Sequence, residues 1–309
     1  NLSERRIQRD LQPIQTVLSQ FYDHVTELSE RGDEMMGVPT GLFDLDLVLG
    51  GMQKSDLLII AGRPGSGKTA FLLTVAKNAA QKYHKNVAFF SLEMSNEQLV
   101  QRLIAQETHI NTKSLRNGKL SDEEWLLFTH AIEVLGDTKI FLDDTPALTP
   151  MQLRTKCRRM HLEYHLDLII VDYIQLMSSD TRNENRVQEV SYISRNLKTL
   201  ARELNVPVLA AAQLSRAVEQ RTDKKPILSD LRESGSLEQD SDIVMFIHRP
   251  DMTEKDISKQ NSAEIIVAKH RNGPVHAGVQ TVFLSEITRF ENAARVEKET
   301  RYKKTSQDE

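Results

Sequence analysis

The segment from Gly62 to Thr69, which reads G-R-P-G-S-G-K-T, constrains the fold of this chain more than any other. It follows an apolar run at 57–61 and precedes a helical pattern at 69–83. The spacing G-x-x-x-x-G-K-T between a strand and a helix is typical of a phosphate-binding loop. Backbone N–H groups of such a loop turn toward phosphate oxygens, and the positive end of the following helix points at them. The segment therefore predicts a P-loop nucleotide-binding fold.

The residue types in this loop predict how a nucleoside triphosphate is bound. We expect Lys68 to reach the outer phosphates and the Thr69 hydroxyl to bind Mg²⁺. Asp172 ends an apolar strand at 168–171 and is the second expected Mg²⁺ ligand, directly or through water. The alternative for Asp172 is a polar cap on a buried strand. The candidate nucleotide-binding residues are Gly62, Arg63, Pro64, Gly65, Ser66, Gly67, Lys68 and Thr69.

Strand-like and helix-like segments alternate from residue 41 onward, which is typical of a mostly parallel, twisted sheet with helices on both faces. The expected strands are 57–61, 87–92, 140–143, 167–172 and 206–212. The expected helices are 69–83, 95–107, 121–136, 150–165 and 186–205. Beyond residue 242 we expect shorter, often antiparallel strands at 242–248, 264–270, 279–284 and 287–290. The fold class is therefore α/β.

The chain divides into three parts by composition. Residues 9–31 carry apolar side chains at spacings of three and four, which predicts an amphipathic helix. Its apolar stripe packs either on its own domain or on a neighbouring subunit or further domain. We expect an amphipathic helix and flexible connector at 1–34, a nucleotide-binding α/β domain at 35–290 and a polar, frayed tail at 291–309.

Composition excludes several classes of protein. The net charge of −4 argues against a protein that binds nucleic acid over a uniformly positive surface. It is compatible with a local basic patch. The single cysteine, Cys157, rules out an internal disulfide and fits a reducing cytosol. No apolar run approaches the roughly 20 residues that span a bilayer, and no secretory leader is visible. We expect a cytoplasmic protein without a membrane partner, and sequence preceding residue 1.

Two further strands of the expected sheet end in polar side chains. Glu93 follows 87–92 and Gln213 follows 206–212. Because ligands of an open parallel sheet gather at the carboxyl ends of its strands, both side chains are candidates for the nucleotide site. Glu93 could orient or deprotonate an attacking water, and Gln213 could hydrogen-bond a terminal phosphate. A helix-capping role for Glu93 and an exposed strand-end position for Gln213 are equally compatible with the residues alone.

Two basic segments are candidates for other contacts. The stretch 214–240 is long, polar and turn-rich, and its cations and the backbone N–H of Gly235 could bind phosphates of a nucleic-acid strand. A solvated loop is the alternative. Lys269 and Arg271 lie two residues apart on a strand that runs into a Gly-Pro turn, so both project from one face. They suit an arginine finger, with a solvated hairpin as the alternative.

Taken together, these motifs resemble the ATPase domain of the DnaB-type replicative DNA helicases, within the RecA-like superfamily. The resemblance covers essentially all of residues 35–290, in order. It is carried by the segments 40–46, 62–69, 91–95, 143–146, 172–176, 213–216, 232–236 and 269–274. Gly65-Ser66 and His270 depart from the common pattern of that family, which suggests a phage-encoded or divergent member.

The resemblance implies roles that the residues alone leave open. Glu93 matches the catalytic glutamate, Asp172 the Mg²⁺-associated aspartate and Gln213 the residue that links the nucleotide to the DNA loops. Arg271, with Lys269, matches a finger that reaches into the next subunit's site. The residues that match the contacts to single-stranded DNA in a central channel are Arg232, Glu233 and Gly235.

The resemblance also implies an assembly and an activity. The helix at 9–31 resembles a linker that docks on an adjacent protomer of a homo-hexameric ring. The implied activity is ATP-dependent 5′→3′ translocation on single-stranded DNA with Mg²⁺. That family also carries an N-terminal domain that engages primase, and we expect primase and a helicase loader as partners through parts outside this chain. The alternatives are a RecA-like recombinase filament and a RecA-like regulatory ATPase that does not bind DNA.

Overall fold

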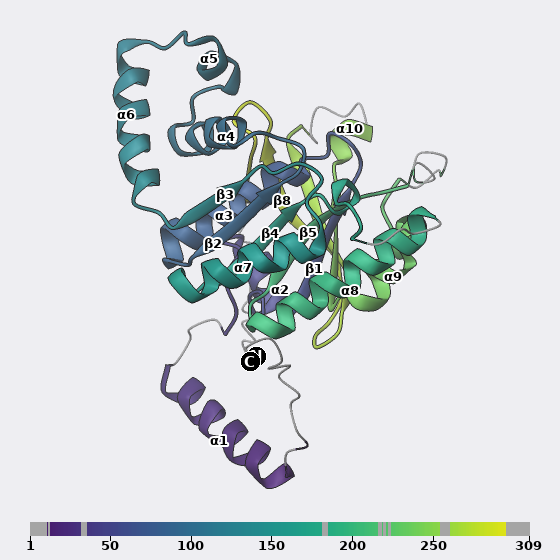
Figure 1. The fold of residues 1–309 in the computed structure, drawn as a ribbon. Coiled ribbons are helices and arrows are strands. Elements are labelled where there is room, and N and C mark those ends of the chain that lie inside the picture. The colour runs from purple at the N-terminus through teal and green to yellow at the C-terminus, as the bar shows by residue number, and fades with distance from the viewer. Residues whose placement is uncertain are drawn as a thin grey trace, which may run out of the picture. The chain divides into compact units, whose positions relative to one another are not determined.

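The computed structural model describes residues 11, 13–31, 36–180, 185–215, 218, 221, 224–253 and 260–294 (Figure 1). At residues 20, 24, 27–31, 232–234 and 253 it describes the backbone alone. The chain forms two compact units, 1–36 and 37–309. In the part of the chain so described, no helix has the length and apolar character needed to cross a bilayer.

The first unit contains the helix α1 (Ile14–Arg31). The helix expected at 9–31 begins at Ile14, because residues 11 and 13 are not helical; residues 9, 10 and 12 lie outside the described part of the chain. The apolar stripe of α1 is exposed over its described length, with Phe21 62% and Tyr22 72% exposed. Nothing within this unit covers that stripe among the residues described.

The second unit is built on a nine-stranded sheet in the order β3-β2-β4-β5-β1-β6-β7-β8-β9. The pairs from β3 to β6 are parallel, and those from β6 to β9 are antiparallel. The strands are β1 (Leu57–Gly62), β2 (Val87–Ser91), β3 (Ile140–Asp143), β4 (Leu168–Asp172), β5 (Val208–Gln213), β6 (Ile243–His248), β7 (Ser262–His270), β8 (His276–Leu284) and β9 (Arg289–Asn292). The mostly parallel α/β sheet expected from the sequence is confirmed.

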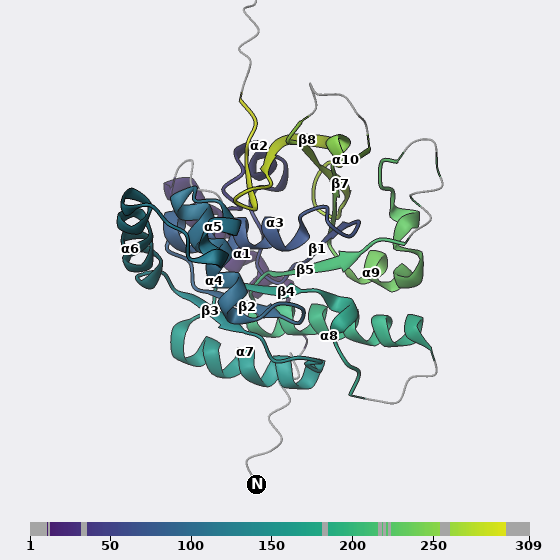
Figure 2. The ribbon, with the colours of Figure 1, turned by 90° about the horizontal axis from the view of Figure 1, so that it is seen from above.

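Helices cover both faces of this sheet, with α7 and α8 on one side and α3 on the other (Figure 2). Their bounds are α2 (Phe43–Leu49), α3 (Lys68–Tyr83), α4 (Asn96–Thr108), α5 (Thr112–Asn117), α6 (Asp122–Gly136), α7 (Pro150–Tyr164), α8 (Arg186–Leu204), α9 (Gly235–Asp240) and α10 (Pro250–Thr253), with the 3₁₀ helices η1 (Ile174–Leu176) and η3 (Leu228–Ser234). Ser95, Ser121 and Thr149 begin α4, α6 and α7 with capping boxes, which explains where these helices start.

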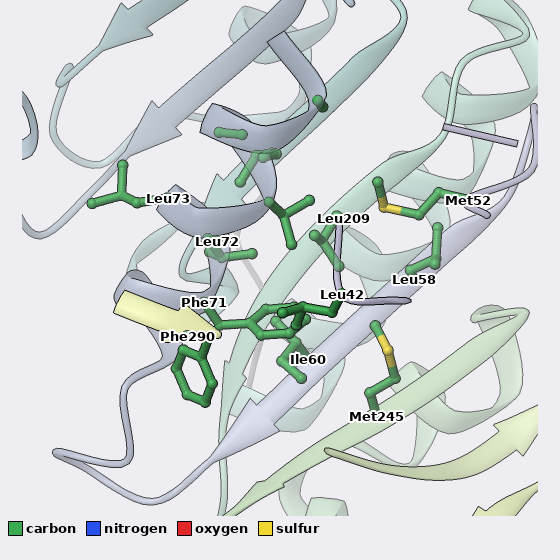
Figure 3. Packing of buried hydrophobic residues seen from close by; sticks show 14 of the residues in the cluster. Leu42, Met52, Leu58, Ile60, Phe71, Leu72, Leu73, Leu209, Met245 and Phe290 are labelled. Carbon is green, nitrogen blue, oxygen red and sulfur yellow. The ribbon is translucent and has the colours of Figure 1, made fainter. Parts of the chain in front are cut away.

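The core has two halves, one on each face of the sheet. Alternate residues of β1 divide between them: Leu58 and Ile60 face α3, whereas Leu57 and Ile59 face the α8 side. Phe71 of α3 meets Phe290 of β9 with ring centroids 5.7 Å apart, and Figure 3 shows this pair beside the residues of β1. The central strand is thus buried on both faces, which fixes the position of the loop that follows it.

The structure corrects two expectations. The stretch 214–240 is not an irregular loop throughout, because η3 and α9 make it helical from Leu228 onward. The last strand runs over Arg289–Asn292 rather than 287–290, since Thr288 has a φ of +51° and ends the turn before it. The sheet therefore extends to Asn292, past the expected domain end at 290.

Candidate nucleotide-binding site

The predicted phosphate loop joins β1 to α3. Gly65 and Gly67 have φ values of +76° and +99°, a region in which side chains are strained. At Gly62 the constraint is space, because an added Cβ would lie 2.4 Å from the Ser66 hydroxyl oxygen. The loop therefore requires these glycines to bring its backbone round to the start of α3, where N–H groups lack helical partners. This is the geometry in which a helix start binds phosphate.

Lys68 is the first residue of α3 and bends back over the loop. Its Nζ donates to the carbonyl oxygens of Gly62, at 3.1 Å, and Arg63, at 3.2 Å. Burial lowers the pKa of Lys68, while the nearby carboxylates of Asp172 and Glu93 act in the opposite direction. The ammonium thus stands at the mouth of the loop with acidic groups on its other side.

Asp172 ends β4 and is 1% exposed. Burial raises its pKa, and the hydrogen bond from the Thr69 hydroxyl and the charge of Lys68 act against that rise. Its Oδ2 atom is buried and has no hydrogen-bond partner among the described residues. A buried carboxylate oxygen beside a threonine hydroxyl fits Mg²⁺, which takes one or two protein oxygens and leaves other positions to water and phosphate.

The carboxyl ends of three neighbouring strands bring the candidate residues together. Ser91 of β2 pairs with Asp172 of β4, and Gly62 of β1 pairs with Gln213 of β5. Glu93, Asp172 and Gln213 all line one cleft of about 530 Å³ above the phosphate loop. The cleft is also lined by Pro64, Gly65, Gly67, Lys68, Thr69, Ala70, Met94, Gln98, Arg102, Tyr173, Phe283 and Thr288.

Several lining residues were missed by the sequence reasoning, and Arg102 is the most informative. Burial lowers its pKa, whereas the charges of Asp172 and Glu93 raise it, so the guanidinium shares the environment of both carboxylates. Gln98 lies one turn earlier on α4 and lines the same cleft. The sequence signal for both residues is their i, i+4 spacing on a helix whose cap, Ser95, lies two residues after Glu93.

Gln213 connects the cleft to a neighbouring cavity. Its backbone N–H donates to Gln175 Oε1 at 3.2 Å, and Gln175 Nε2 donates back to the Gln213 carbonyl at 3.3 Å. The cavity, of about 310 Å³, reaches Asp230 and Leu231 of η3. The Ser215 N–H donates to the Asp230 carbonyl at 3.1 Å. Gln213 therefore stands between the nucleotide cleft and the 214–240 segment.

The candidate DNA contacts lie in that segment. Arg232 and Glu233 belong to η3, and their side chains fall outside the description. Gly235 begins α9 with an ordinary helical φ of −54° and is exposed. Among the residues described, no heavy atom lies within 4 Å of a Cβ added there. Neither the backbone conformation nor the described packing therefore requires a glycine at residue 235.

Lys269 and Arg271 lie at the opposite end of the sheet from the cleft. Lys269 Nζ donates to the carbonyl oxygens of Glu238 and Ser241, the latter at 2.7 Å. Arg271 Nη1 lies 3.0 Å from Asp242 Oδ1. The Asp242 N–H in turn donates to the carbonyl of Leu57, the first residue of β1.

The length of β1 therefore separates this pair from the phosphate loop of the same chain. At about 3.3 Å per residue, six residues of strand place the two ends about 17 Å apart. The structure brings Lys68, Thr69, Glu93, Asp172 and Gln213 together, and leaves Lys269 and Arg271 outside that cleft.

The sheet order, the phosphate loop and the strand-end cleft define a P-loop NTPase domain of the RecA-like type. A family model described as the DnaB-like helicase C terminal domain matches residues 37–292. The chain belongs to this family, which confirms the resemblance found in the sequence.

Individual relatives agree with this assignment. The replicative DNA helicase DnaB of Geobacillus stearothermophilus is 50% identical over 295 residues, covering 95% of this chain and 65% of that protein. The replicative DNA helicase DnaC of Bacillus subtilis is 48% identical over 295 residues, with the same coverage of 95% and 65%. The chain thus spans about two thirds of the length of these curated relatives.

Solved structures agree as well. One of them, an isolated ATPase domain, superposes with a TM-score of 0.86 at 37% identity, covering 92% of this chain and all of that one. A second structure, described as that of a DnaB-like replicative helicase and its interactions with primase, superposes with a TM-score of 0.83 at 37% identity. The match covers 92% of this chain and 68% of that one. The similarity of fold therefore extends over almost the whole chain.

Proposed function

We propose that this chain is the ATP-hydrolysing motor of a replicative DNA helicase, which works as a homo-hexameric ring and moves 5′→3′ along single-stranded DNA. One observation carries the proposal. Glu93 and Asp172 line the cleft at one end of the sheet, whereas Lys269 and Arg271 lie at the other end, too far away to reach the cleft of the same chain. The two pairs of residues meet only when copies of the chain stand side by side.

The cleft of one subunit binds and orients ATP. The glycine loop and the start of α3 hold the phosphates. Lys68 exchanges its hydrogen bonds to the loop carbonyls for contacts to the outer phosphates. Thr69 and Asp172 hold Mg²⁺, which when bound supplies positive charge to the phosphate oxygens. Glu93 orients the attacking water and accepts its proton, and Gln213 hydrogen-bonds the terminal phosphate.

The neighbouring subunit completes the site with Arg271, assisted by Lys269. A guanidinium that approaches the terminal phosphate stabilises the charge that develops as the phosphoryl group is transferred. Because the finger comes from another subunit, hydrolysis is coupled to how the subunits stand in the ring. Gln213 and its contact to Gln175 pass the state of the nucleotide to the 214–240 segment.

The ring also needs contacts outside the active sites. We assign α1 as the linker that packs its apolar stripe on an adjacent subunit. The second unit exposes apolar side chains of α6 that suit such a contact, since Trp125 is 50% and Leu126 is 74% exposed. Large apolar side chains exposed next to each other are typical of a protein interface.

Single-stranded DNA binds along the ring's channel through Arg232, Glu233 and Gly235. Repetition of one modest basic segment around a ring gives the channel a positive lining despite the net charge of −4. The open space at Gly235 allows a phosphate to approach the backbone closely. Primase and a helicase loader are the further partners, through parts beyond this chain, and the site of action is the cytoplasm.

Electron microscopy with a nonhydrolysable ATP analogue, paired with unwinding of a forked duplex, tests this function. We expect closed six-membered rings, ATPase activity per chain that rises with protein concentration, and unwinding of forks with a free 5′ tail. Helical filaments without unwinding indicate a recombinase. Monomers whose ATPase is indifferent to concentration and to oligonucleotide contradict the proposal.

A further inference from the structure

A buried carboxylate holds the candidate finger at the end of the sheet opposite the nucleotide cleft. The side chains of Asp242 and Arg271 are 4% and 52% exposed, and Asp242 Oδ1 lies 3.0 Å from Arg271 Nη1. The backbone N–H of Arg271 also donates to the Asp242 carbonyl at 2.9 Å. The arginine is therefore anchored to one residue by its main chain and by one end of its guanidinium, while half of the side chain faces solvent.

The second oxygen of Asp242 is fixed from the inside of the domain. Its Oδ2 accepts from the Leu57 N–H at 2.8 Å and from the Lys198 ammonium. Lys198 is held in turn by the Ser55 carbonyl, at 2.8 Å. The carboxylate cannot rotate without losing these partners, so the direction of Oδ1 is set by β1, β6 and α8. Asp56, whose Oδ1 lies 3.8 Å from the Lys198 ammonium, is the other carboxylate of this cluster.

The chemistry of the guanidinium makes this anchor useful. Arginine carries five N–H donors in a planar fork, so a single contact to Asp242 leaves donors on the other edge for phosphate oxygens. An unanchored arginine side chain loses much rotamer freedom when it binds. A charge-assisted hydrogen bond to a fixed carboxylate removes part of that loss in advance, and it orients the outer edge of the fork.

We propose that Asp242 is the positioning residue for Arg271, and that it aims the guanidinium out of the domain at the terminal phosphate bound by the neighbouring subunit. Asp242 touches neither the nucleotide nor the metal and acts only through the arginine. This inference rests on the proposed function, because it requires a finger that works across a subunit boundary.

The first test is the steady-state ATPase of Asp242→Asn with single-stranded DNA. The amide keeps the size of the side chain and loses the charge, so we expect kcat to fall about tenfold or more while KM for ATP stays within about twofold. The matched control is Asp143→Asn, a carboxylate at the end of the edge strand β3 that pairs with Lys156 and should keep kcat near wild type. In an Arg271→Ala background, Asp242→Asn should change kcat no further. A further loss of similar size there would overturn the proposal.

Mixed rings separate positioning from a general effect on the fold. A chain with Lys68→Ala supplies fingers but no working cleft, and a chain with Arg271→Ala supplies clefts but no finger. Mixing them should restore ATPase activity at those interfaces where the Arg271→Ala chain supplies the cleft and the Lys68→Ala chain supplies the finger. Asp242→Asn placed on the finger-supplying chain should lower that activity about tenfold, and placed on the other chain should leave it unchanged. Equal effects on either chain contradict the role of Asp242, whereas no restoration at all contradicts the shared site itself.

A second variant remains informative if Asp242→Asn does not fold. Arg271→Lys keeps the positive charge at an exposed position and leaves the buried atoms of Asp242 in place, but an ammonium lacks the two-edged fork. We expect its kcat to match that of Arg271→Ala within about threefold. A kcat close to wild type shows that no anchored fork is needed and refutes the assignment of Asp242.

Discussion

The ammonium of Lys68 lies 3.1 Å from the carbonyl oxygen of Gly62, so the lysine donates to the loop in which it stands. Burial lowers the pKa of Lys68, because the loop and the start of α3 shield the ammonium from water. A phosphate that enters the loop replaces the carbonyl oxygens with charged ones, which are better partners. The binding of ATP is therefore expected to depend on a lysine that is already desolvated in the free protein.

Replacing Lys68 by methionine tests this expectation. Lys68→Met should weaken binding of an ATP analogue at least about tenfold, since one charge-assisted contact is lost. It should not lower the melting temperature, because a partly desolvated cation has been removed. Calorimetric titration and thermal unfolding measure the two effects. Lys77→Met is the matched control, because that buried lysine pairs with Glu107 at 2.6 Å, away from the cleft, so stability should fall and binding should not.

Arg271→Ala should separate turnover from binding. The arginine stands about 17 Å from the phosphate loop of its own chain, so its loss leaves the cleft intact. We expect the affinity for ATP to stay within about twofold and kcat to fall by about 10³ or more, the range known for arginine fingers. Fluorescent-nucleotide binding and phosphate release measure the two quantities. Normal turnover in this variant is incompatible with a finger that acts across the subunit boundary.

The sequence predicts the parts of the site that a local pattern specifies. The glycine spacing identifies the phosphate loop, and apolar runs that end in Glu93, Asp172 or Gln213 identify strand ends. A parallel sheet gathers such ends at one edge, so three segments far apart in the chain could be placed together before any geometry was known. The structure adds the order of the strands, which puts Gln213 directly beside Gly62.

Other contacts depend on tertiary geometry that no local pattern contains. Arg102 reaches the cleft only because α4 packs against α3 with that face turned inward. The pairing of Asp242 with Arg271 requires the antiparallel register of β6 and β7, in which Ile243 lies opposite His270. Neither Arg102 nor Asp242 belongs to a distinctive motif of its own. The helical part of 228–240 was hidden for a related reason, since its polar composition is typical of loops.

Gly235→Ala should distinguish a DNA contact from a structural glycine. The residue has a helical φ, and no heavy atom of the described part of the chain lies within 4 Å of the added Cβ, so alanine should keep or raise the melting temperature. If the DNA backbone approaches this position closely, the methyl group should weaken binding of single-stranded DNA about tenfold, as measured by fluorescence anisotropy at fixed salt. Gly136→Ala is the control, because it also has open space and ends α6. Equal DNA affinity in both variants removes Gly235 from the interface.

Asp56 predicts a pH dependence of stability with a defined sign. Burial and the neighbouring Asp242 carboxylate raise the pKa of Asp56 from 3.8 to about 6, although Lys198 acts against them. At a pH between 3.8 and about 6, Asp56 keeps its proton in the folded chain but has lost it in the unfolded chain. The contribution of Asp56 to the free energy of unfolding therefore falls as the pH rises through this range. Asp56→Asn removes that loss. The difference in melting temperature between variant and wild type should therefore be small at about pH 4, grow up to about pH 7 and then level off. A difference that is independent of pH contradicts the raised pKa.

The exposed stripe of α1 gives the last prediction. Leu18 and Phe21 are 57% and 62% exposed, and burying such side chains between subunits contributes roughly 25 cal/mol for each Å² of apolar surface removed from water. The double variant Leu18→Ser, Phe21→Ser should therefore weaken assembly of the proposed ring, seen by light scattering as smaller species than the wild type forms at the same concentration. At a concentration at which both proteins are monomeric, the melting temperature of the second unit should stay the same, because these side chains belong to the other unit. Asp23→Ser, which changes an exposed polar residue of the same helix, should leave assembly intact. If the double variant assembles as stably as the wild type, the apolar stripe of α1 does not form the contact between subunits.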